Sequence, residues 1–469
     1  MKGKQKKIEY PPLAEEMSGG WMNLMRVFGP GAIIASVTVG TGETIFAPRT
    51  GAIFGYAMLW VILITVLFKA AQVYTGARYL VLTGEHPCGA WARIPGPRAW
   101  AVWLIGLLAV ISFPMWIATL ADAVASLCVW ITGIGGGEDK TSRKLWGTGI
   151  VVAAMLLSLV QTYNVIERVS TVILVFKVIL IFIAVMIVKP DWAAALSGLL
   201  VPQLPDYQPW VAASYPEVTK NPSWLEMAVL MGAVGGGVQD YVGYVGFLRE
   251  KKWGAAGIED GSPQNLPNDR KMIARGKRWL RAPALDTIVS FGSVLLITGC
   301  FMVLGAAVLH PNHLVPGNDD LYSKQSQFLA VIHPALVTLY KAGIFFAIFG
   351  VIYAAFELYT RTAYEPLRAL WPQREWNLKK LRLWVVLYSG LGGLAILWSG
   401  AQTVTIAKYV SPFSGVLGCG LWCLAMIWVE RTQLPRVYRM KDLLLLLTII
   451  AGITMTIIGG YVTVRSWTN

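Results

Sequence analysis

Two acidic residues, Glu43 and Asp240, are the side chains in this sequence that are best placed to do chemistry. Each stands inside a hydrophobic stretch that is long enough to cross a bilayer. A carboxylate at that depth is energetically costly and is usually functional. Both residues are therefore candidate ligands for a cation or a proton. The structural alternatives are a fixed link from Glu43 to a neighbouring lysine or arginine, and capping of a helix by Asp240.

Glycine-rich breaks surround both carboxylates. Segment 37–44 reads VTVGTGET and segment 232–241 reads GAVGGGVQDY. Glycine lacks a Cβ and weakens helices, and unpaired backbone groups are tolerated in a membrane only inside protein or beside a watery cavity. Matching breaks in the two halves of a membrane protein indicate a central transport site. The predicted substrate-binding residues are Gly40, Thr41, Glu43, Gly236, Gly237, Gln239 and Asp240, and the predicted metal ligands are Glu43 and Asp240.

Three further charged residues within apolar runs are predicted to couple transport to protons, namely Asp122, Lys177 and Glu357. A buried lysine changes its protonation state readily, so Lys177 beside either carboxylate could switch between charged and neutral forms. A fixed ion pair is the alternative. Lys69 and Lys408 carry less weight, because a lysine away from the middle of a span can extend its ammonium to the membrane surface.

The composition places these residues in an integral membrane protein. Of the 469 residues, 55% are hydrophobic and 14% are charged, whereas soluble proteins carry about 25% charged residues. A shorter amphipathic stretch at 191–202 is expected at a membrane surface. Eleven apolar runs are long enough to span a bilayer, and they lie at about 28–47, 52–82, 99–131, 145–163, 166–188, 225–247, 283–309, 335–361, 383–400, 404–429 and 440–464.

The positions of the breaks predict how the spans are organised. Because span 1 and span 6 both contain a break, spans 1–5 and 6–10 are expected to form an inverted repeat, as in many secondary transporters, with an eleventh helix added. No phosphate-binding loop or nucleophile–base pattern occurs, so we expect neither an ATP-driven pump nor an enzyme, and no cofactor. The predicted divisions are a tail at 1–27, a first repeat at 28–188, a loop with a surface helix at 189–224, a second repeat at 225–429 and a last span at 440–464.

The positive charge is explained by membrane topology. The net charge is +14, and the lysines and arginines gather in the amino-terminal tail and in the loops after spans 6, 8 and 10. Cytoplasmic loops carry such an excess, so we predict a plasma-membrane protein with a cytoplasmic amino terminus and an external carboxyl terminus. Its expected partners are the lipid bilayer, protons and a small ion or small-molecule substrate, and nucleic-acid binding is disfavoured.

Several short stretches resemble the Nramp divalent-metal transporters. Segments 29–36 (GPGAIIAS) and 51–60 (GAIFGYAMLW) are similar to the first and second spans of that family, and 82–84 (LTG) is similar to the end of the second. Segment 232–233 (GA) aligns with the start of the sixth-span motif, and 411–413 (SPF) resembles a Leu-Pro-Phe in the tenth span. The resemblance implies an all-α, LeuT-like 5+5 inverted repeat with helices 1 and 6 broken, plus an eleventh transmembrane helix.

The family's metal-binding motifs are altered in this sequence. Its first-span Asp-Pro-Gly-Asn falls on 40–43, so that Gly40 replaces the Asp and Glu43 replaces the Asn. Its sixth-span Met-Pro-His falls on Gly236, Gly237 and Val238, which removes the soft sulfur ligand and the histidine suited to proton relay.

These departures shape the predicted function. Carboxylates and carbonyls suit hard cations such as Mg²⁺ or Ca²⁺, so we predict a secondary active transporter of Nramp type. It would take up a divalent cation harder than manganese or iron, in a proton-linked manner. The alternative is a proton-coupled transporter of a small organic solute, such as an amino acid or an organic acid. A receptor or scaffold that no longer cycles is a third possibility, which a shared cavity between the two breaks would argue against.

Overall fold

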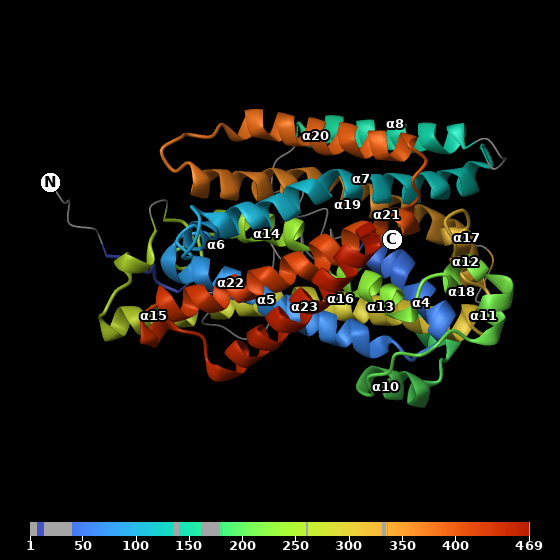
Figure 1. The fold of residues 1–469 in the computed structure, drawn as a ribbon, viewed down its shortest axis with the longest axis horizontal. Helices are drawn as coiled ribbons and strands as arrows, with labels where there is room; N and C mark the ends of the chain where they lie inside the picture. Colours follow the sequence, from blue (N-terminus) through green and yellow to red (C-terminus); the bar gives the residue numbers. More distant parts are fainter. Residues whose placement is uncertain are drawn as a thin grey trace.

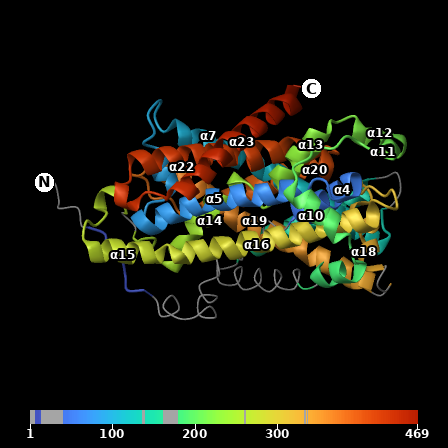
Figure 2. The same cartoon turned by 90° about the horizontal axis from the view of Figure 1, so that it is seen from below.

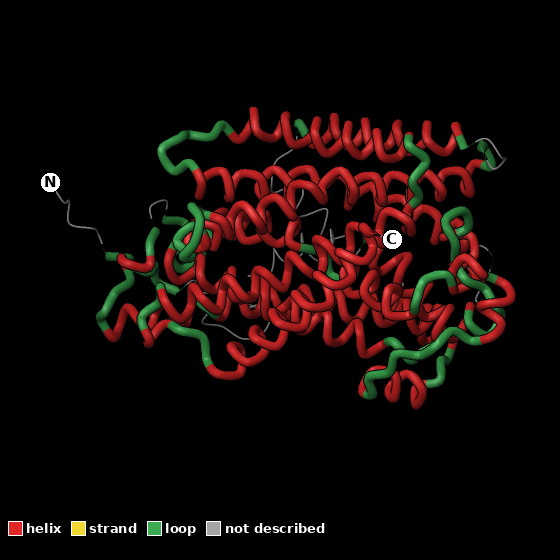
Figure 3. The backbone as a smooth tube through the Cα atoms, viewed as in Figure 1, coloured by secondary structure: helices red, strands yellow, loops and turns green. Residues whose placement is uncertain are grey.

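The computed structural model describes residues 7–13, 40–135, 140–160, 179, 181–258, 261–330, 334 and 336–468. These residues form helices and loops without a strand (Figure 3), which confirms the all-α prediction. Within this part of the chain, seven helices are long and apolar enough to cross a membrane. They are Leu59–Thr83, Trp100–Thr132, Arg270–Leu309, Tyr340–Leu370, Leu378–Trp398, Thr403–Thr432 and Asp442–Thr468.

Four helices form one layer, drawn at the top of Figure 1. Backbones within this layer approach closely at glycines: a Cβ on Gly392 would lie 2.9 Å from Pro114, and one on Gly393 would lie 2.7 Å from Ile117. Small residues permit such approach, which favours helix association in lipid. The four helices are α7 (Trp100–Thr132), α8 (Thr141–Ser158), α19 (Leu336–Leu370) and α20 (Leu378–Trp398), and each packs against the other three.

The broken spans lie beside this layer. Helix α14 packs against both α7 and α19, so the second break is held against the four-helix layer, while α16 packs against α4 and α5. The broken spans and the helices grouped with them, outside the four-helix layer, are η1 (Gly42–Phe46), α4 (Ala47–Phe54), α5 (Leu59–Thr83), α13 (Ser223–Ala233), α14 (Val238–Lys251), α16 (Arg281–Leu304), η3 (Gly305–Leu309), α21 (Thr403–Val410), η4 (Ser411–Leu417), α22 (Gly418–Thr432) and α23 (Asp442–Thr468).

Short elements cover the two ends of the bundle (Figure 2). At the α15 end, the segment 7–13 is tied to the rest of the chain, since the Ile8 amide donates to the Asn265 carbonyl at 2.8 Å and the Trp279 indole donates to the Pro11 carbonyl at 3.0 Å. The short elements are α6 (Pro87–Trp91), α10 (Trp192–Leu200), α11 (Pro209–Ser214), α12 (Pro216–Thr219), η2 (Pro263–Asn265), α15 (Arg270–Trp279), α17 (Leu321–Gln325), α18 (Gln327–Ala330) and η5 (Arg436–Tyr438).

The expected spans are found where the structure describes them. Helix α8 falls on the fourth predicted span, the pair α13 and α14 on the sixth, and α10 on the predicted surface helix. Most of span 1 and much of span 5 lie outside the described residues. The boundaries of the two repeats therefore stay a prediction.

Candidate functional site

The second glycine-rich segment is a true helix break. Helix α13 ends at Ala233, Val234 is extended, and α14 begins at Val238. Between them, Gly235 and Gly236 have φ values of +75° and +85°, a left-handed conformation that favours glycine. The consecutive glycines allow the backbone to take this left-handed conformation between the two half-helices. The predicted interruption of span 6 is confirmed.

The first segment differs from the prediction in its extent. From Thr41 onward the chain is already helical, and Gly42–Phe46 forms a π-helical turn before α4. Glu43 therefore lies in the first turn of a helix rather than in unwound backbone, and residues 37–39 lie outside the described part of the chain. Gly42 is required here for a packing reason, because a Cβ would lie 2.2 Å from the Ala233 carbonyl oxygen.

The two carboxylates make the same local hydrogen bond in the two halves of the chain. Glu43 Oε2 accepts from the amide of Gly40 at 2.9 Å, and Asp240 Oδ2 accepts from the amide of Gly237 at 2.8 Å. Each acid thus reaches back three residues to an amide that the helix leaves unpaired, as in a capping box. A negative charge in the first turn also favours the helix dipole. Capping is therefore part of what both residues do.

Glu43 also joins the two broken spans directly. Its Oε1 accepts a hydrogen bond from the amide of Gly235 at 2.9 Å, and its side chain is fully buried. Both carboxylate oxygens are thereby held by backbone amides, one on each side of the contact between the spans. Glu43 thereby links the two segments inside the membrane, in addition to the close packing of Gly42 on Ala233.

Lys69 on α5 occupies the carbonyl groups of the second break. Its Nζ donates to the carbonyls of Gly232 at 3.1 Å, Val234 at 2.6 Å and Gly236 at 2.6 Å. The side chain is fully buried, so the expectation that it extends to the membrane surface is wrong. The hydroxyl of Tyr241 binds the remaining carbonyl of the break, that of Gly235. An ammonium thus sits where unwound carbonyls would otherwise hold a cation.

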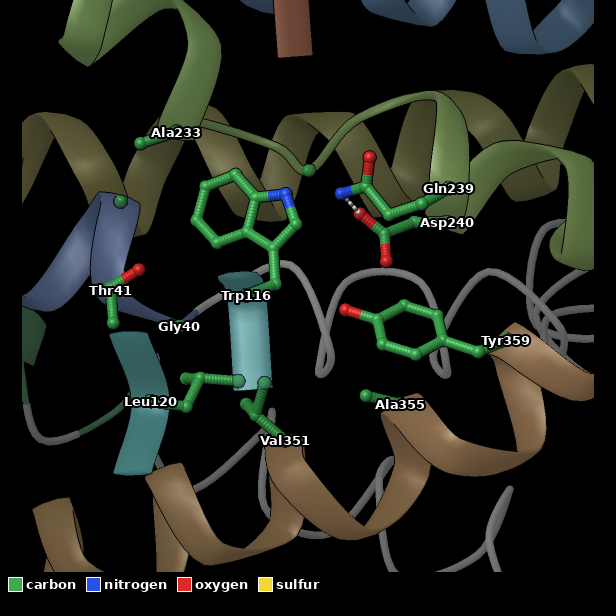
Figure 4. A pocket seen from close by; sticks show the side chains of 12 residues that line it. Gly40, Thr41, Trp116, Leu120, Ala233, Gln239, Asp240, Val351, Ala355 and Tyr359 are labelled. Carbon is green, nitrogen blue, oxygen red and sulfur yellow. Dashed lines mark hydrogen bonds between the residues drawn. The ribbon is translucent and has the colours of Figure 1, made fainter. Parts of the chain in front are cut away.

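A small cavity lies between the two breaks and the four-helix layer (Figure 4). Its volume is about 40 Å³, enough for roughly three water molecules. In Figure 4, the carboxylate of Asp240 and the hydroxyl of Tyr359 face the space beside the indole of Trp116. The cavity is lined by Gly40, Thr41, Gly42, Trp116, Leu120, Ala233, Gly236, Gln239, Asp240, Val351, Ala355 and Tyr359.

The structure brings most of the predicted site residues together. Gly40, Thr41, Gly236, Gln239 and Asp240 all border this one cavity. Gln239 donates from Nε2 to Asp240 Oδ2 at 2.7 Å, and its own Oε1 is buried without a hydrogen-bond partner. That unpaired oxygen leaves the site with an unused acceptor for a ligand or a water.

Two of the residues predicted to bind the substrate do not line the cavity. Glu43 and Gly237 are absent from the residues that border it, and Glu43 is held by amides as described. Among the described residues, no group of three or more histidines, cysteines, aspartates or glutamates is arranged to hold a metal ion. If a cation binds here, its ligands must include hydroxyl, amide or backbone oxygens beside Asp240.

Two of the three residues predicted to couple protons, Asp122 and Glu357, form ion pairs away from the cavity. Asp122 pairs with Arg143 at 2.9 Å and accepts from the Thr403 hydroxyl at 2.8 Å. Glu357 pairs with Arg382 at 2.5 Å. Neither acid borders the cavity, and Lys177 lies outside the described residues. Their role in proton coupling stays a prediction.

Buried ion pairs also hold the bundle on both sides of the cavity. Arg49 on α4 pairs with Glu226 on α13 at 3.6 Å, which ties together the half-helices that follow the first break and precede the second. Toward the other end, Arg78 on α5 pairs with Glu430 on α22. Pairing of this kind could not be seen in the sequence, because the partners come from spans far apart in the chain.

Comparison with known proteins places the chain in a family. The model of the natural resistance-associated macrophage protein-like (Nramp) family matches residues 31–465. The chain belongs to the Nramp family. A divalent metal cation transporter MntH of Ralstonia nicotianae is 23% identical over 329 residues, covering 70% of this chain and 65% of that protein. An uncharacterised protein of Pasteurella multocida is 21% identical over 384 residues, covering 81% and 78% of the two chains.

Solved structures share the fold of this chain at low sequence identity. A manganese transporter of Eremococcus coleocola, solved as a mutant, superposes with a TM-score of 0.68 at 14% identity and covers 97% of this chain and 88% of that one. The transporter MhsT in complex with L-phenylalanine superposes with a TM-score of 0.56 at 16% identity, covering 92% and 98%. These similarities show that this Nramp protein has the LeuT-like fold, and it is a multi-pass membrane protein.

Proposed function

We propose that this protein is a secondary transporter that moves a divalent cation, harder than manganese, through the cavity between the two breaks. The observation that carries the proposal is the cavity itself. It is bordered by both broken spans, it has room for an ion and a few waters, and Asp240 contributes a carboxylate to it. No sulfur or imidazole lines it among the described residues, which favours a hard cation bound through oxygen.

The charges around the cavity are compatible with cation binding. Counted as ionised, Glu43 and Asp240 contribute two negative charges and Lys69 one positive charge, a sum of −1 in a buried region. A net negative charge away from water attracts a cation more strongly than it would at the surface. Because Lys69 already fills the carbonyls of the second break, the substrate ligands would be Asp240, Gln239, Thr41 and the backbone near Gly40.

Asp240 also offers a way to link the cation to protons. A carboxylate that faces the cavity can hold a proton or a cation, and the two compete for the same oxygen. Binding of the cation would then release a proton on whichever side the cavity is open. We assign this exchange to Asp240, and we place the protein in the plasma membrane with its amino terminus in the cytoplasm, as the distribution of lysine and arginine predicts.

Uptake into proteoliposomes tests this function. We expect Mg²⁺ or Ca²⁺ flux that depends on a pH gradient, and loss of at least tenfold of that flux in Asp240→Asn. Asp206→Asn is the matched control, because Asp206 is exposed in a loop and does not line the cavity. Absence of Mg²⁺ and Ca²⁺ flux in the wild-type protein, whether or not Mn²⁺ or Fe²⁺ is transported, would refute the proposal.

One observation favours an organic solute as a second candidate. The wall of the cavity opposite the breaks is apolar and aromatic, formed by Trp116, Leu120, Val351, Ala355 and Tyr359, which is typical of small-molecule sites. A screen of thermal stability against divalent metals, amino acids and organic acids separates the two substrates. Stabilisation by an amino or organic acid, with none from a divalent metal, would favour the second candidate.

A further inference from the structure

A second, larger pocket lies at the end of the bundle that carries α15. Its volume is about 480 Å³, and it is formed between α5, the junction of α15 and α16, and the segment from η5 to the start of α23. It is separate from the cavity between the breaks, since the two share no lining residue. Five basic residues line it, namely Arg78, Lys277, Arg281, Arg439 and Lys441.

The charge of this basic pocket is not balanced locally. No acidic residue is among the residues that border it in the described part of the chain. Arg78 is engaged by Glu430 and by the Tyr438 carbonyl, and Arg439 donates to the Leu434 carbonyl at 2.9 Å.

Three of the basic residues have no acidic partner. Lys277, Arg281 and Lys441 are exposed, and none of them has a carboxylate within 4.0 Å among the described residues. Three cations therefore border one space without a counter-ion among the residues that the structure describes.

The pocket also has an aliphatic side. Leu280, Ala284 and Leu444 line it beside the basic residues. One turn further along α16 from Ala284, Ile288 is 67% exposed, and residues four apart lie on the same helix face. An exposed aliphatic path thus leads from the basic residues along a membrane-spanning helix, which is the surface that a lipid chain would cover.

We propose that this basic pocket binds the headgroup of an anionic phospholipid. The phosphate would lie among Lys277, Arg281 and Lys441, and an acyl chain would follow α16 past Ala284 and Ile288. Basic pockets between transmembrane helices at the cytoplasmic face attract anionic headgroups, with about 1 kcal/mol, or fivefold in affinity, for each lysine or arginine near the surface. A soluble anion would use the cations but would leave the aliphatic path uncovered, so the lipid fits both features.

Binding there has a structural consequence. The pocket is bordered by Arg78 and Tyr438, and the Tyr438 hydroxyl donates to the Pro267 carbonyl at 2.8 Å. A bound headgroup would therefore brace the contact between α5, the loop before α15, and the segment before α23. Helix α5 also carries Lys69, so the lipid would stabilise one of the helices that form the transport site.

The test compares lipid binding by the full-length protein and by two double variants. Phosphatidylglycerol in nanodiscs is titrated against phosphatidylcholine, and bound lipid is counted by native mass spectrometry. We expect the double variant Lys277→Gln and Arg281→Gln to bind phosphatidylglycerol about 25-fold more weakly than the wild-type protein. The double variant Lys379→Gln and Lys380→Gln makes the same charge change at exposed positions on α20, outside the pocket, and should bind normally.

Two outcomes would overturn the assignment. The first is equal binding of phosphatidylglycerol by the wild type and by the Lys277 and Arg281 double variant. The second is stabilisation by inorganic phosphate that equals stabilisation by the lipid, because this would identify a soluble anion as the ligand. The single variant Lys441→Gln, expected to lose about fivefold, keeps the test decisive if the double variant does not fold.

Discussion

Replacing Lys69 with methionine is the change that most directly probes the site. Methionine keeps an unbranched side chain of similar length but removes the ammonium. Three backbone carbonyls, those of Gly232, Val234 and Gly236, then lose their donor in a buried region. In addition, the carboxylates of Glu43 and Asp240 lose the positive charge beside them.

The magnitude follows from the burial of these groups. Each of the three carbonyls left without a donor costs about 1–3 kcal/mol, and the loss of the positive charge near Glu43 and Asp240 adds to this cost. The contributions share one ion and do not add fully, so we expect Lys69→Met to lower the free energy of unfolding by about 3–5 kcal/mol. That corresponds to roughly two to three and a half orders of magnitude in the folding equilibrium.

The assay is equilibrium unfolding in mixed micelles, with Lys379→Met as the control at an exposed position of α20. Surface substitutions of this kind stay within about 0.5 kcal/mol. A companion variant, Lys69→Ala, leaves space for n-propylammonium, which should restore part of the lost stability, whereas tetramethylammonium should not. If Lys69→Met unfolds within about 0.5 kcal/mol of the wild type, the ammonium does not hold the second break and our account of the site fails.

Two further predictions test the packing of the spans and a titratable group outside them. The variant Gly232→Ala should be destabilised by about 1–3 kcal/mol, because the added Cβ would lie 2.2 Å from the Ser411 carbonyl oxygen. The control Gly292→Ala, whose Cβ would have no neighbour within 4 Å, should fold normally. Equal thermal stability of the two variants would contradict this prediction. His86 lies in the loop after α5, and its pKa is lowered to about 4, mainly because burial disfavours the charged form of the imidazole. The unfolded chain therefore binds a proton near pH 6.5, whereas the folded chain does not. The free energy of unfolding should therefore fall as the pH drops from about 6.5 to about 4. The variant His86→Asn keeps an acceptor for the Cys88 amide and should lose that part of the pH dependence of the unfolding midpoint. An unchanged pH profile in this variant would refute the assignment to His86.

Much of the architecture could be predicted because hydropathy and glycine content are local properties of a chain. Runs of apolar residues set the spans, and the three consecutive glycines at 235–237 allowed the second break to be placed to within a few residues. The extent of the first break was harder to predict. A π-helical turn begins at Gly42, and Gly42 packs on the backbone of Ala233, a residue of a span that lies far away in the sequence.

The partners of the buried charges could not be predicted for the same reason. Asp122 and Glu357 have arginine partners on neighbouring helices, and the sequence contains no signal of which helices are neighbours. A lysine in an apolar run is compatible with reaching the membrane surface or with binding inside. The sequence analysis gave Lys69 little weight, and its place in the span that follows the first break is a signal that could have pointed to it.

The sequence by itself determined that this chain crosses a membrane many times, where its broken helices lie, and that acidic residues stand at both breaks. These features follow from residue type and spacing. Only the tertiary structure decided that Glu43 joins the breaks through backbone amides, that Lys69 fills the carbonyls of the second break, and that Asp240 borders the cavity. The direction of a buried polar group is set by the nearest unpaired donor or acceptor, and the packing of distant helices determines which group that is.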